Sequence, residues 1–454
     1  MSRPAWHAAV IGPVAEEALS HALDAAARLR SVEQAQAAAD AALKESTHPE
    51  YQHWVGHSIA QGNAGIALMA AYLDECLPNE GWDIAGRDHL TTAAKSIPVD
   101  AGVSAALFGG LSGLGYAALA LSKGGSRYRN LLCSVDEAIR DLAIGMCDEL
   151  KASRGGMSVA AFDVISGISG VAAYLVARLE HGTEHVLPTL RRLLEAMTVM
   201  SEDVGGLPGW WTPPHLMFDK VAAEHFPHGN LNCGLAHGIP GPLAALAIAR
   251  LAGVESQGLT GGIERLAQWL ASYRIEDEWG VTWPTAVPVI EEKESPGVVL
   301  RPAPVSRLRS SRTAWCYGSP GVARALWLAG EALDNSSWRQ MSIEAMRAVF
   351  RKPLPNRQID SATFCHGVSG LLQIVLRFWH DTELPDFRVA AEDLVRQLNG
   401  LYVPESRLGF LSLERGEQPL AKPGLLDGAP GVVLALLAAV RGVMPGWDRL
   451  FLLS

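Results

Sequence analysis

A turn of the form Gly-x-x-Gly, followed by a long apolar run, recurs along this chain. Each run is apolar on nearly every side, as in GVVLALLAAV, and a helix that is apolar all round has to be buried. The intervals between the first glycines of the turns are 48, 57, 71, 80, 49 and 61 residues. The pattern predicts seven buried helices, each beginning at one of these turns. The turns are Gly62–Gly65, Gly110–Gly113, Gly167–Gly170, Gly238–Gly241, Gly318–Gly321, Gly367–Gly370 and Gly428–Gly431.

Between the buried runs, charged and apolar positions alternate at helical spacing, which predicts surface helices with one buried face. Two further helices are expected before the first turn, within residues 14–43. The clearest of the surface segments are residues 135–151, 186–197, 263–273 and 389–398.

Seven buried helices that alternate with seven half-exposed ones predict an all-α fold, in which an inner ring of helices lies inside an outer ring. An open solenoid is the alternative. A closed ring is favoured because both ends of the series keep the repeat and no polar capping repeat is present. We expect one domain, residues 1–454, with all seven turns at one rim. Two longer intervals, residues 201–233 and 276–309, are predicted to be rim insertions with short strands.

Alignment of the repeats on their first glycine places reactive side chains at equivalent positions. Cys316 and Cys365 lie two residues before the glycines of consecutive repeats, so the fold brings them together. The residues directly before the seven first glycines are Gln61, Gly109, Ser166, His237, Tyr317, His366 and Asp427, and the residues before those are Ala60, Phe108, Ile165, Ala236, Cys316, Cys365 and Leu426.

Cys316, Cys365 and His366 offer two thiolates and one imidazole, a set that suits Zn²⁺. Three protein ligands leave a fourth position free, which is typical of a catalytic rather than a structural zinc site. We therefore expect one Zn²⁺ ion. Such an ion can bind a substrate thiol and lower its pKa.

Several other candidates have ordinary structural roles when they are taken singly. A buried cysteine usually acts as a small hydrophobic residue, which is the role expected for Cys76, Cys133 and Cys147. Cys233 is expected to pack in the same way, although it could also serve as a spare metal ligand. Tyr317 could cap a helix or pack.

Composition and charge narrow the classes of function. The chain contains 38 Lys and Arg residues against 48 Asp and Glu residues, a net charge of −10, which argues against nucleic-acid binding. No signal peptide and no membrane span are expected. The six cysteines are sparse and irregularly spaced, as in a cytoplasmic protein with free thiols.

At its reactive residues the chain resembles the lanthionine synthetase C-like family, the lantibiotic cyclases. The resemblance extends over the seven repeats and is weakest before about residue 51 and in the two predicted insertions. One departure is the segment NCGLAHG, in which Cys233 stands in a stretch expected to read Asn-x-Gly or Asn-Leu-Gly. The matching segments are FDVISGISG, NCGLAHGIPG, RTAWCYGSPG and FCHGVSG.

The resemblance implies an α/α toroid with a zinc site at its mouth, held by Cys316, Cys365 and His366. It further implies that His237 is the acid/base residue. The remaining active-site polar residues would be Asp163, Arg312 and Tyr317.

The activity implied by the resemblance joins a peptide cysteine to dehydroalanine or dehydrobutyrine in a thioether ring. The partners implied are a dehydrated precursor peptide with its leader and a separate dehydratase. Association with a membrane-bound biosynthetic complex is compatible with both.

Three other functions stay open at this point. A related enzyme would add glutathione or another small thiol to dehydrated residues. A protein prenyltransferase also uses an α/α barrel and zinc-activated thiols, but the sequence has no clustered Lys and Arg for a diphosphate. A non-catalytic scaffold with structural zinc would need a fourth protein ligand, such as Cys233 or His237.

Overall fold

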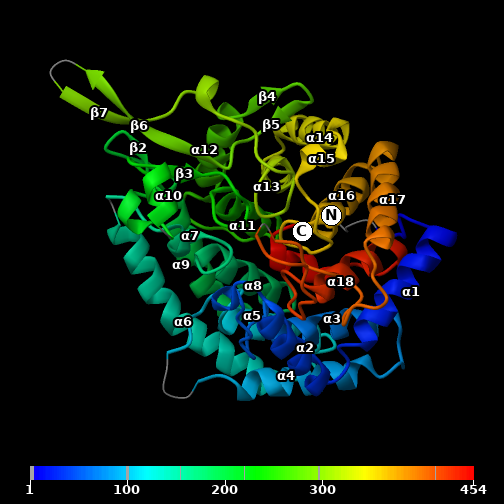
Figure 1. Cartoon of the computed structure of the whole chain (residues 1–454). Coiled ribbons are helices and arrows are strands. Elements are labelled where there is room, and N and C mark those ends of the chain that lie inside the picture. Colours follow the sequence, from blue (N-terminus) through cyan, green and yellow to red (C-terminus); the bar gives the residue numbers. More distant parts are fainter. Residues whose placement is uncertain (1–4, 99–101, 154, 219, 295–296, 415) are drawn as a thin grey trace. The chain divides into compact units, whose positions relative to one another are not determined.

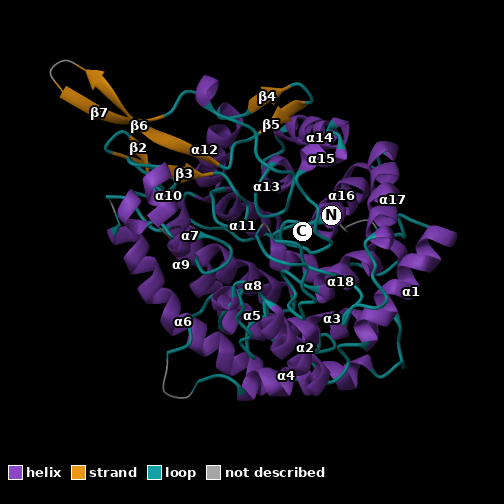
Figure 2. Ribbon diagram, viewed as in Figure 1, coloured by secondary structure: helices purple, strands orange, loops and turns teal. Residues whose placement is uncertain are grey.

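In the computed structural model of this protein, the described residues are 5–98, 102–153, 155–218, 220–294, 297–414 and 416–454. Helices dominate, and the strands of the described chain all fall between residues 203 and 302 (Figures 1 and 2). The chain forms two compact units. The first comprises Met1–Ser104, Phe108–Val135 and Gln358–Arg449, and the second comprises Ala105–Leu107, Asp136–Arg357 and Leu450–Ser454.

The first unit contains four helices that begin at Gly-x-x-Gly turns. Helix α16 packs on α18, α18 on α3, and α3 on α5. Each begins one residue after the first glycine of its turn, and that glycine is the N-cap. The four helices are α3 (Asn63–Cys76), α5 (Leu111–Ala120), α16 (Val368–Thr382) and α18 (Ala429–Val440).

The second unit contains the other three: α8 (Ile168–Glu180), α11 (Pro240–Leu251) and α13 (Ser319–Ala332). Helix α11 packs on both α8 and α13. It begins two residues after Gly238, and Pro240 occupies its first position, where proline costs no hydrogen bond. The prediction of seven buried helices that begin at seven turns is confirmed.

The second glycine of a turn leaves no room for a side chain. A Cβ atom on Gly65 would lie 2.3 Å from the carbonyl oxygen of Ile59 in its own turn and 2.8 Å from Cβ of Leu425 in the neighbouring turn. A Cβ atom on Gly431 would meet Leu425 O at 2.4 Å and Cβ of Phe364 at 2.9 Å. The glycines therefore allow the backbones of neighbouring turns to approach closely.

Backbone hydrogen bonds join neighbouring turns of the first unit. The amide of Cys365 donates to the carbonyl of Leu426 at 3.0 Å, and the amide of Leu426 donates to Ala60 at 3.2 Å. Ala60 in turn donates to Phe108 at 3.2 Å. These residues all stand two positions before the first glycine of their turns, so the predicted register is confirmed in this unit.

The turns of the second unit are joined in the same direction. The amide of Ala236 donates to the carbonyl of Cys316 at 3.2 Å, and the amide of Val164 donates to Ala236 at 3.1 Å. The third turn thus uses Val164, whereas the alignment predicted Ile165. The difference is one residue, and the ladder between the turns is kept.

An outer helix covers the side of each of six inner helices. The pairs are α3 with α4, α16 with α17, α18 with α1, α8 with α9, α11 with α12, and α13 with α14. The two helices predicted within residues 14–43 are confirmed as α1 and α2. The outer helices are α1 (Pro13–Ala27), α2 (Val32–Glu45), α4 (Trp82–Lys95), α6 (Arg129–Ala152), α9 (Leu187–Met200), α12 (Leu259–Ser272), α14 (Ser336–Arg351) and α17 (Pro385–Gly400).

Short elements complete the two units. The short α-helices are α7 (Val159–Phe162), α10 (Lys220–His225) and α15 (Leu354–Arg357), and the 3-10 helices are η1 (Pro49–Tyr51), η2 (Glu184–Val186), η3 (Pro214–Leu216), η4 (Val305–Arg307) and η5 (Gly446–Phe451).

The strands belong to the second unit and form small antiparallel sheets. They occur in both segments predicted as insertions, although residues 219, 295 and 296 lie outside the described residues. The assignment of these segments to the rim stays a prediction. Strand β1 (Asp203–Val204) pairs with β2 (Leu207–Pro208), β4 (Ile275–Asp277) pairs with β5 (Gly280–Thr282), and β6 (Ala286–Glu294) lies between β3 (Asn230–Asn232) and β7 (Gly297–Pro302).

One prediction for the spare cysteines is wrong. Cys76 and Cys147 are buried as expected, and burial raises the pKa of their thiols to about 12 and about 11. Cys133, in contrast, is exposed. It lies on α6 between the buried residues Leu132 and Val135 but faces the opposite side of the helix.

A buried ion pair ties α16 to the end of the first unit. The guanidinium of Arg377 donates to both carboxylate oxygens of Asp448, at 2.5 and 2.6 Å, and Gln373 donates to the same carboxylate at 2.6 Å. The two charged side chains are 5% and 0% exposed. The carboxylate therefore compensates a charge that would otherwise be buried alone.

We predict that Asp448→Ala lowers the free energy of unfolding by about 3–5 kcal/mol, because Arg377 is left buried without its partner. The matched control is Glu392→Ala, which removes an exposed ion pair to Arg396 on α17 and should cost less than about 1 kcal/mol. Urea denaturation followed by circular dichroism measures both. Equal losses for the two variants would contradict the structural role assigned to Asp448.

Candidate metal centre and acid–base site

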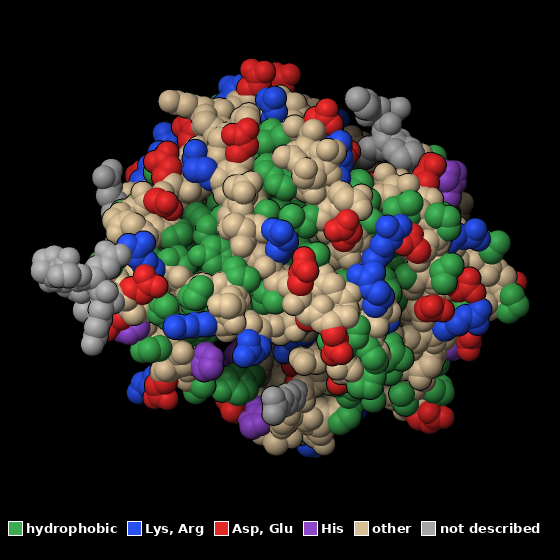
Figure 3. All heavy atoms as spheres, turned by 90° about the horizontal axis from the view of Figure 1, so that it is seen from above, with side chains coloured by type: hydrophobic (Ala, Val, Ile, Leu, Met, Phe, Trp, Pro, Cys, Tyr) green, Lys and Arg blue, Asp and Glu red, His purple; other side chains and the backbone are tan. Residues whose placement is uncertain are grey.

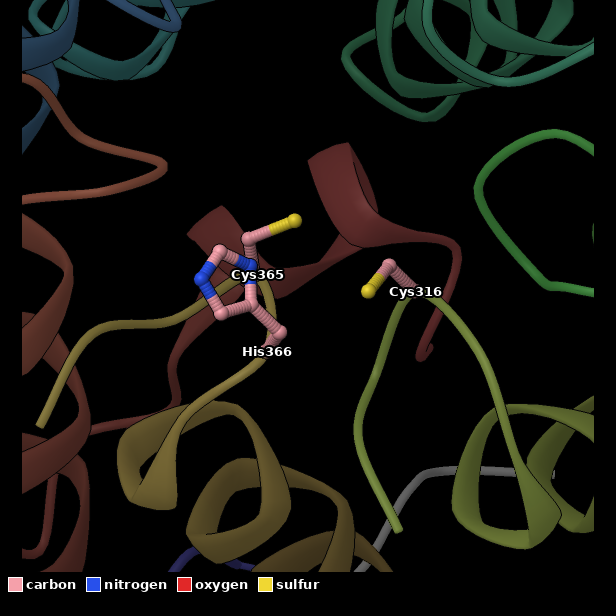
Figure 4. Close-up of side chains that lie close together, drawn as sticks. All are labelled: Cys316, Cys365 and His366. Atoms are coloured by element: carbon pink, nitrogen blue, oxygen red, sulfur yellow. The ribbon is translucent and has the colours of Figure 1, made fainter. Parts of the chain in front are cut away.

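Cys316, Cys365 and His366 form a cluster of potential metal ligands. Cys316 precedes α13, and the other two residues precede α16 (Figure 4). Each residue offers one ligand atom, and these atoms all lie within 4.8 Å of one another. Two thiols and one imidazole at this separation fit the donor set and geometry that Zn²⁺ takes in proteins, with one tetrahedral position left over.

The imidazole of His366 lies beside two carboxylates of the first unit. Its Nε2 atom is 3.0 Å from Oε1 of Glu414. Asp427, in the turn before α18, belongs to the same group of closely spaced oxygen and nitrogen atoms. A histidine that binds a metal usually donates its other ring N–H to a carboxylate, which fixes the ring orientation. The surroundings of His366 fit that role.

Asp427 occupies the position directly before the first glycine of the seventh turn, which is the position that His366 occupies in the sixth. Burial raises the pKa of its carboxyl group, an effect that the nearby His366 and Lys422 oppose. Gln61, the equivalent residue of the first turn, donates to Oδ2 of Asp427 at 3.2 Å. The position directly before the first glycine thus carries a polar side chain in three successive turns of this unit: His366, Asp427 and Gln61.

His237 and Asp163 form a hydrogen-bonded pair in the second unit. The His237 Nδ1 atom lies 2.6 Å from Oδ2 of Asp163. The other carboxylate oxygen of Asp163 accepts from the amides of Ser166 and Gly167, at 2.7 and 2.8 Å, at the start of α8. The carboxylate is 1% exposed, whereas the imidazole is 25% exposed. Asp163 is therefore rigidly held and fixes the orientation of a solvent-accessible imidazole.

Cys316 lies next to this pair because its turn is hydrogen-bonded to the turn of His237 through Ala236. The following residue, Tyr317, has its ring centroid 6.3 Å from that of His237. The side-chain amide of Asn232, on β3, donates to the Tyr317 hydroxyl at 3.1 Å and accepts from the amide of Gly234 at 2.9 Å.

Gly234 permits this close approach. A Cβ atom there would lie 2.5 Å from the ring of Tyr317 and 2.7 Å from the carbonyl oxygen of Cys316. Analysis of the sequence did not identify Asn232 as a site residue. The Asn-x-Gly spacing was the signal that could have identified it.

Phe218 is a further neighbour of His237 that sequence analysis missed. Its ring meets the imidazole edge to face, with the centroids 5.1 Å apart and the planes at 79°. The Phe218 side chain is 64% exposed. It comes from the segment 201–233, whose position relative to the repeats has no sequence signal.

Arg312 and Cys233, two further candidates from the sequence, take no part in the hydrogen bonds described above. Arg312 is exposed, and the hydrogen bonds that join Asp163 to His237 and Asn232 to Tyr317 do not include it. Cys233 is buried beside the carbonyl of Leu231, and burial raises the pKa of its thiol far above the usual range. It belongs to neither ligand group found among the described residues. Its burial fits the expected packing role.

The surface offers two further observations. On the face drawn in Figure 3, the described Lys and Arg side chains are interspersed with Asp and Glu, and no extended basic surface of the kind that nucleic acids require is present there. Among the described residues, none of the helices combines the length and apolar character that a membrane crossing requires.

Comparison of the sequence with known proteins identifies related proteins and a family. The family model described as "Lanthionine synthetase C-like protein" matches residues 53–452. The chain is 24% identical to the nisin biosynthesis protein NisC of Lactococcus lactis subsp. lactis over 361 residues, which cover 78% of this chain and 82% of that protein.

A solved structure, nisin cyclase, has a TM-score of 0.72 to this chain at 21% sequence identity, with 88% of this chain and 93% of that one covered. Nisin cyclase is an α/α toroid. The likeness confirms the predicted all-α toroid and rules out the open solenoid. The seven turns, the Cys–Cys–His cluster and the match over almost the whole repeat region lead to one conclusion: the chain belongs to the lanthionine synthetase C-like family.

Proposed function

We propose that this protein is a zinc-dependent peptide cyclase. It adds cysteine thiols of a peptide to dehydroalanine or dehydrobutyrine residues of the same peptide and so forms thioether rings. The observation that carries the proposal is the position of Cys316 and the His237–Asp163 pair on neighbouring, hydrogen-bonded turns. A candidate thiol-binding centre and a candidate proton-transfer residue are thus placed side by side.

The reaction adds S–H across a carbon–carbon double bond. The sulfur bonds to the β-carbon, the electron pair of the double bond moves toward the α-carbon and the carbonyl oxygen, and a proton then joins the α-carbon. No oxidant or reductant is needed. A Zn²⁺ ion held by Cys316, Cys365 and His366 would supply a Lewis acid that lowers the pKa of the attacking thiol.

His237 is the proposed proton carrier. Because an ionised carboxylate only accepts hydrogen bonds, the contact to Asp163 assigns the hydrogen to Nδ1 and leaves Nε2 as the acceptor. Nε2 takes the thiol proton and delivers a proton to the α-carbon. Asp163 holds the ring in this tautomer and stabilises the imidazolium that forms between the two transfers.

Tyr317 is the proposed donor to the enolate oxygen. A donor aimed at the atom where charge develops lowers the barrier. Asn232 fixes the position of the Tyr317 hydroxyl. We keep Arg312 as a candidate for binding the peptide carbonyl, because it is exposed close to Cys316 along the chain.

The proposed substrate is a precursor peptide that carries a leader and has been dehydrated by a separate enzyme. The name of the relative, nisin biosynthesis protein, supports a peptide substrate. We also propose that residues 1–454 act as one catalytic domain and that residues 201–233 border the site, since Phe218 of that segment touches His237.

We predict that Cys316→Ala and Cys365→Ala each lower zinc affinity at least about 100-fold, because loss of a ligand should exceed the 10–100-fold effect of changing an outer partner. Cys133→Ala is the matched control, since Cys133 is exposed on α6. Metal content after gel filtration and competition with a chelator measure the effect. Retention of one zinc per chain in both variants would exclude the proposed centre.

We predict that His237→Ala keeps its zinc and loses about 10²–10⁴-fold in the rate of ring formation, the usual contribution of a general acid–base residue. The assay is mass spectrometry of a dehydrated peptide after thiol alkylation, which counts the free cysteines. His48→Ala, an exposed histidine near η1, serves as the control. Rates equal to wild type would remove His237 from the mechanism.

The same assay separates ring formation from addition of a small thiol. A dehydrated peptide without cysteine, incubated with glutathione, should gain no adduct if the protein is a cyclase. An adduct formed faster with glutathione than a ring with the cysteine peptide would favour the small-thiol enzyme instead.

A further inference from the structure

A pocket of the first unit lies between α2 and two of the Gly-x-x-Gly turns. Leu43 of α2, Trp54 after η1, Gln61 before α3 and Asp427 before α18 line different sides of it. Its cavity volume is about 70 Å³. That volume is below the range of about 300–1,000 Å³ that is typical of pockets for whole small ligands, so the pocket is sized for part of a larger ligand.

One exposed apolar side chain lies in the wall of this pocket, and two more flank a lining segment in the sequence. Leu43, in its wall, is 47% exposed. Tyr51 and Val55 flank the lining segment that contains Trp54, and they are 70% and 40% exposed. An exposed leucine in a pocket wall offers surface that an apolar group of a ligand can cover. Trp54 supplies a broad, rigid wall, as aromatic residues do at binding sites.

The pocket adjoins the candidate metal centre through a shared residue. Asp427 lines the pocket, and its carboxylate lies within 4.8 Å of the potential ligand atom of His366. Gln61, another lining residue, donates to Asp427 from the next turn. One residue of an extended peptide spans about 3.3–3.6 Å. One or two residues of extended peptide therefore cover the distance between His366 and Asp427.

We propose that this pocket binds an apolar side chain of the peptide substrate, one or two residues from the cysteine that forms the ring. The inference rests on the proposed function. It adds that the pocket helps to select which cysteine of the peptide reacts. Leu43 and Trp54 hold the apolar side chain, and Gln61 lies where the peptide passes from the pocket to the metal centre.

The features of the pocket favour a peptide segment over other occupants. The volume of about 70 Å³ suits a single side chain and not a whole small ligand or a folded partner. Lys422 and Asp40 at the lining offer a cation and a carboxylate, which suit the carbonyl and amide groups of a passing backbone. A freely diffusing small thiol would have no need of an apolar wall beside the imidazole.

The test compares two dehydrated peptides that differ only in having leucine or asparagine on both sides of the cysteine. The wild-type protein should process the leucine peptide with about tenfold higher kcat/KM, the lower end of the effect of filling an apolar pocket. Leu43→Asp should remove this preference by raising KM for the leucine peptide, and its zinc content should stay near wild type.

Val389→Asp is the matched control. It places the same charge at an exposed apolar position, 61% exposed, on α17 of the same unit, and it should keep the preference. A second readout needs no reaction: fluorescence anisotropy of a labelled, undehydrated leucine peptide should show about tenfold weaker binding to Leu43→Asp than to Val389→Asp.

The outcomes separate the pocket from the chemistry. Ring formation with equal kcat/KM for both peptides, or equal effects of the two substitutions, would overturn the pocket and leave the cyclase intact. Pocket-dependent peptide binding without ring formation on either peptide would support the pocket and reject the cyclase. If Leu43→Asp and Val389→Asp both bind the leucine peptide as tightly as the wild type, the proposed pocket is wrong, whether or not rings form.

Discussion

Within each unit, hydrogen bonds between the backbones of successive Gly-x-x-Gly turns hold in place the turns that carry candidate site residues. Each bond runs from the amide of one turn to the carbonyl of the next, at nearly the same register position. A carbonyl and an amide that are buried in this way need partners, so a turn cannot slip by one residue without losing its partners on both sides. The side chains next to these hydrogen bonds therefore keep fixed positions relative to those of the neighbouring turns.

This constraint explains why chemically different groups occupy equivalent places. His237, Tyr317, His366 and Asp427 stand directly before a first glycine and project from the same level of their turns. The two units present different side chains in this way. In the first unit two carboxylates lie beside His366, and in the second an imidazole lies against a buried carboxylate that also accepts from the amides of Ser166 and Gly167. These two hydrogen bonds hold the Asp163 carboxylate in place.

The repeats made most of the fold predictable from the sequence. Each repeat contains a short turn that needs two glycines and a helix that is apolar all round. Both features can be recognised in the sequence of every repeat, so the positions of the helices and the alignment of the turns could be predicted. The alignment was one residue off in the third turn, where the backbone donor is Val164 and not Ile165. The error at Cys133 arose because a single cysteine does not reveal which side of an outer helix it occupies.

The rest of the site depends on contacts between distant segments, which leave little mark in the sequence. Glu414 and Phe218 lie in irregular stretches, and their neighbours His366 and His237 are 48 and 19 residues away in the chain. Asn232 was within reach of the sequence, because its glycine neighbour had a recognisable spacing.

The ladder between the turns tolerates very different lengths of connecting chain. The first and second turns begin 48 residues apart, and the fourth and fifth begin 80 residues apart, yet the hydrogen bond that joins each pair is 3.2 Å long. A longer connecting segment adds little to the entropic cost of closing the loop between two turns. Evolution can therefore lengthen, shorten or replace the peripheral segments of such a protein without disturbing the spacing between its turns.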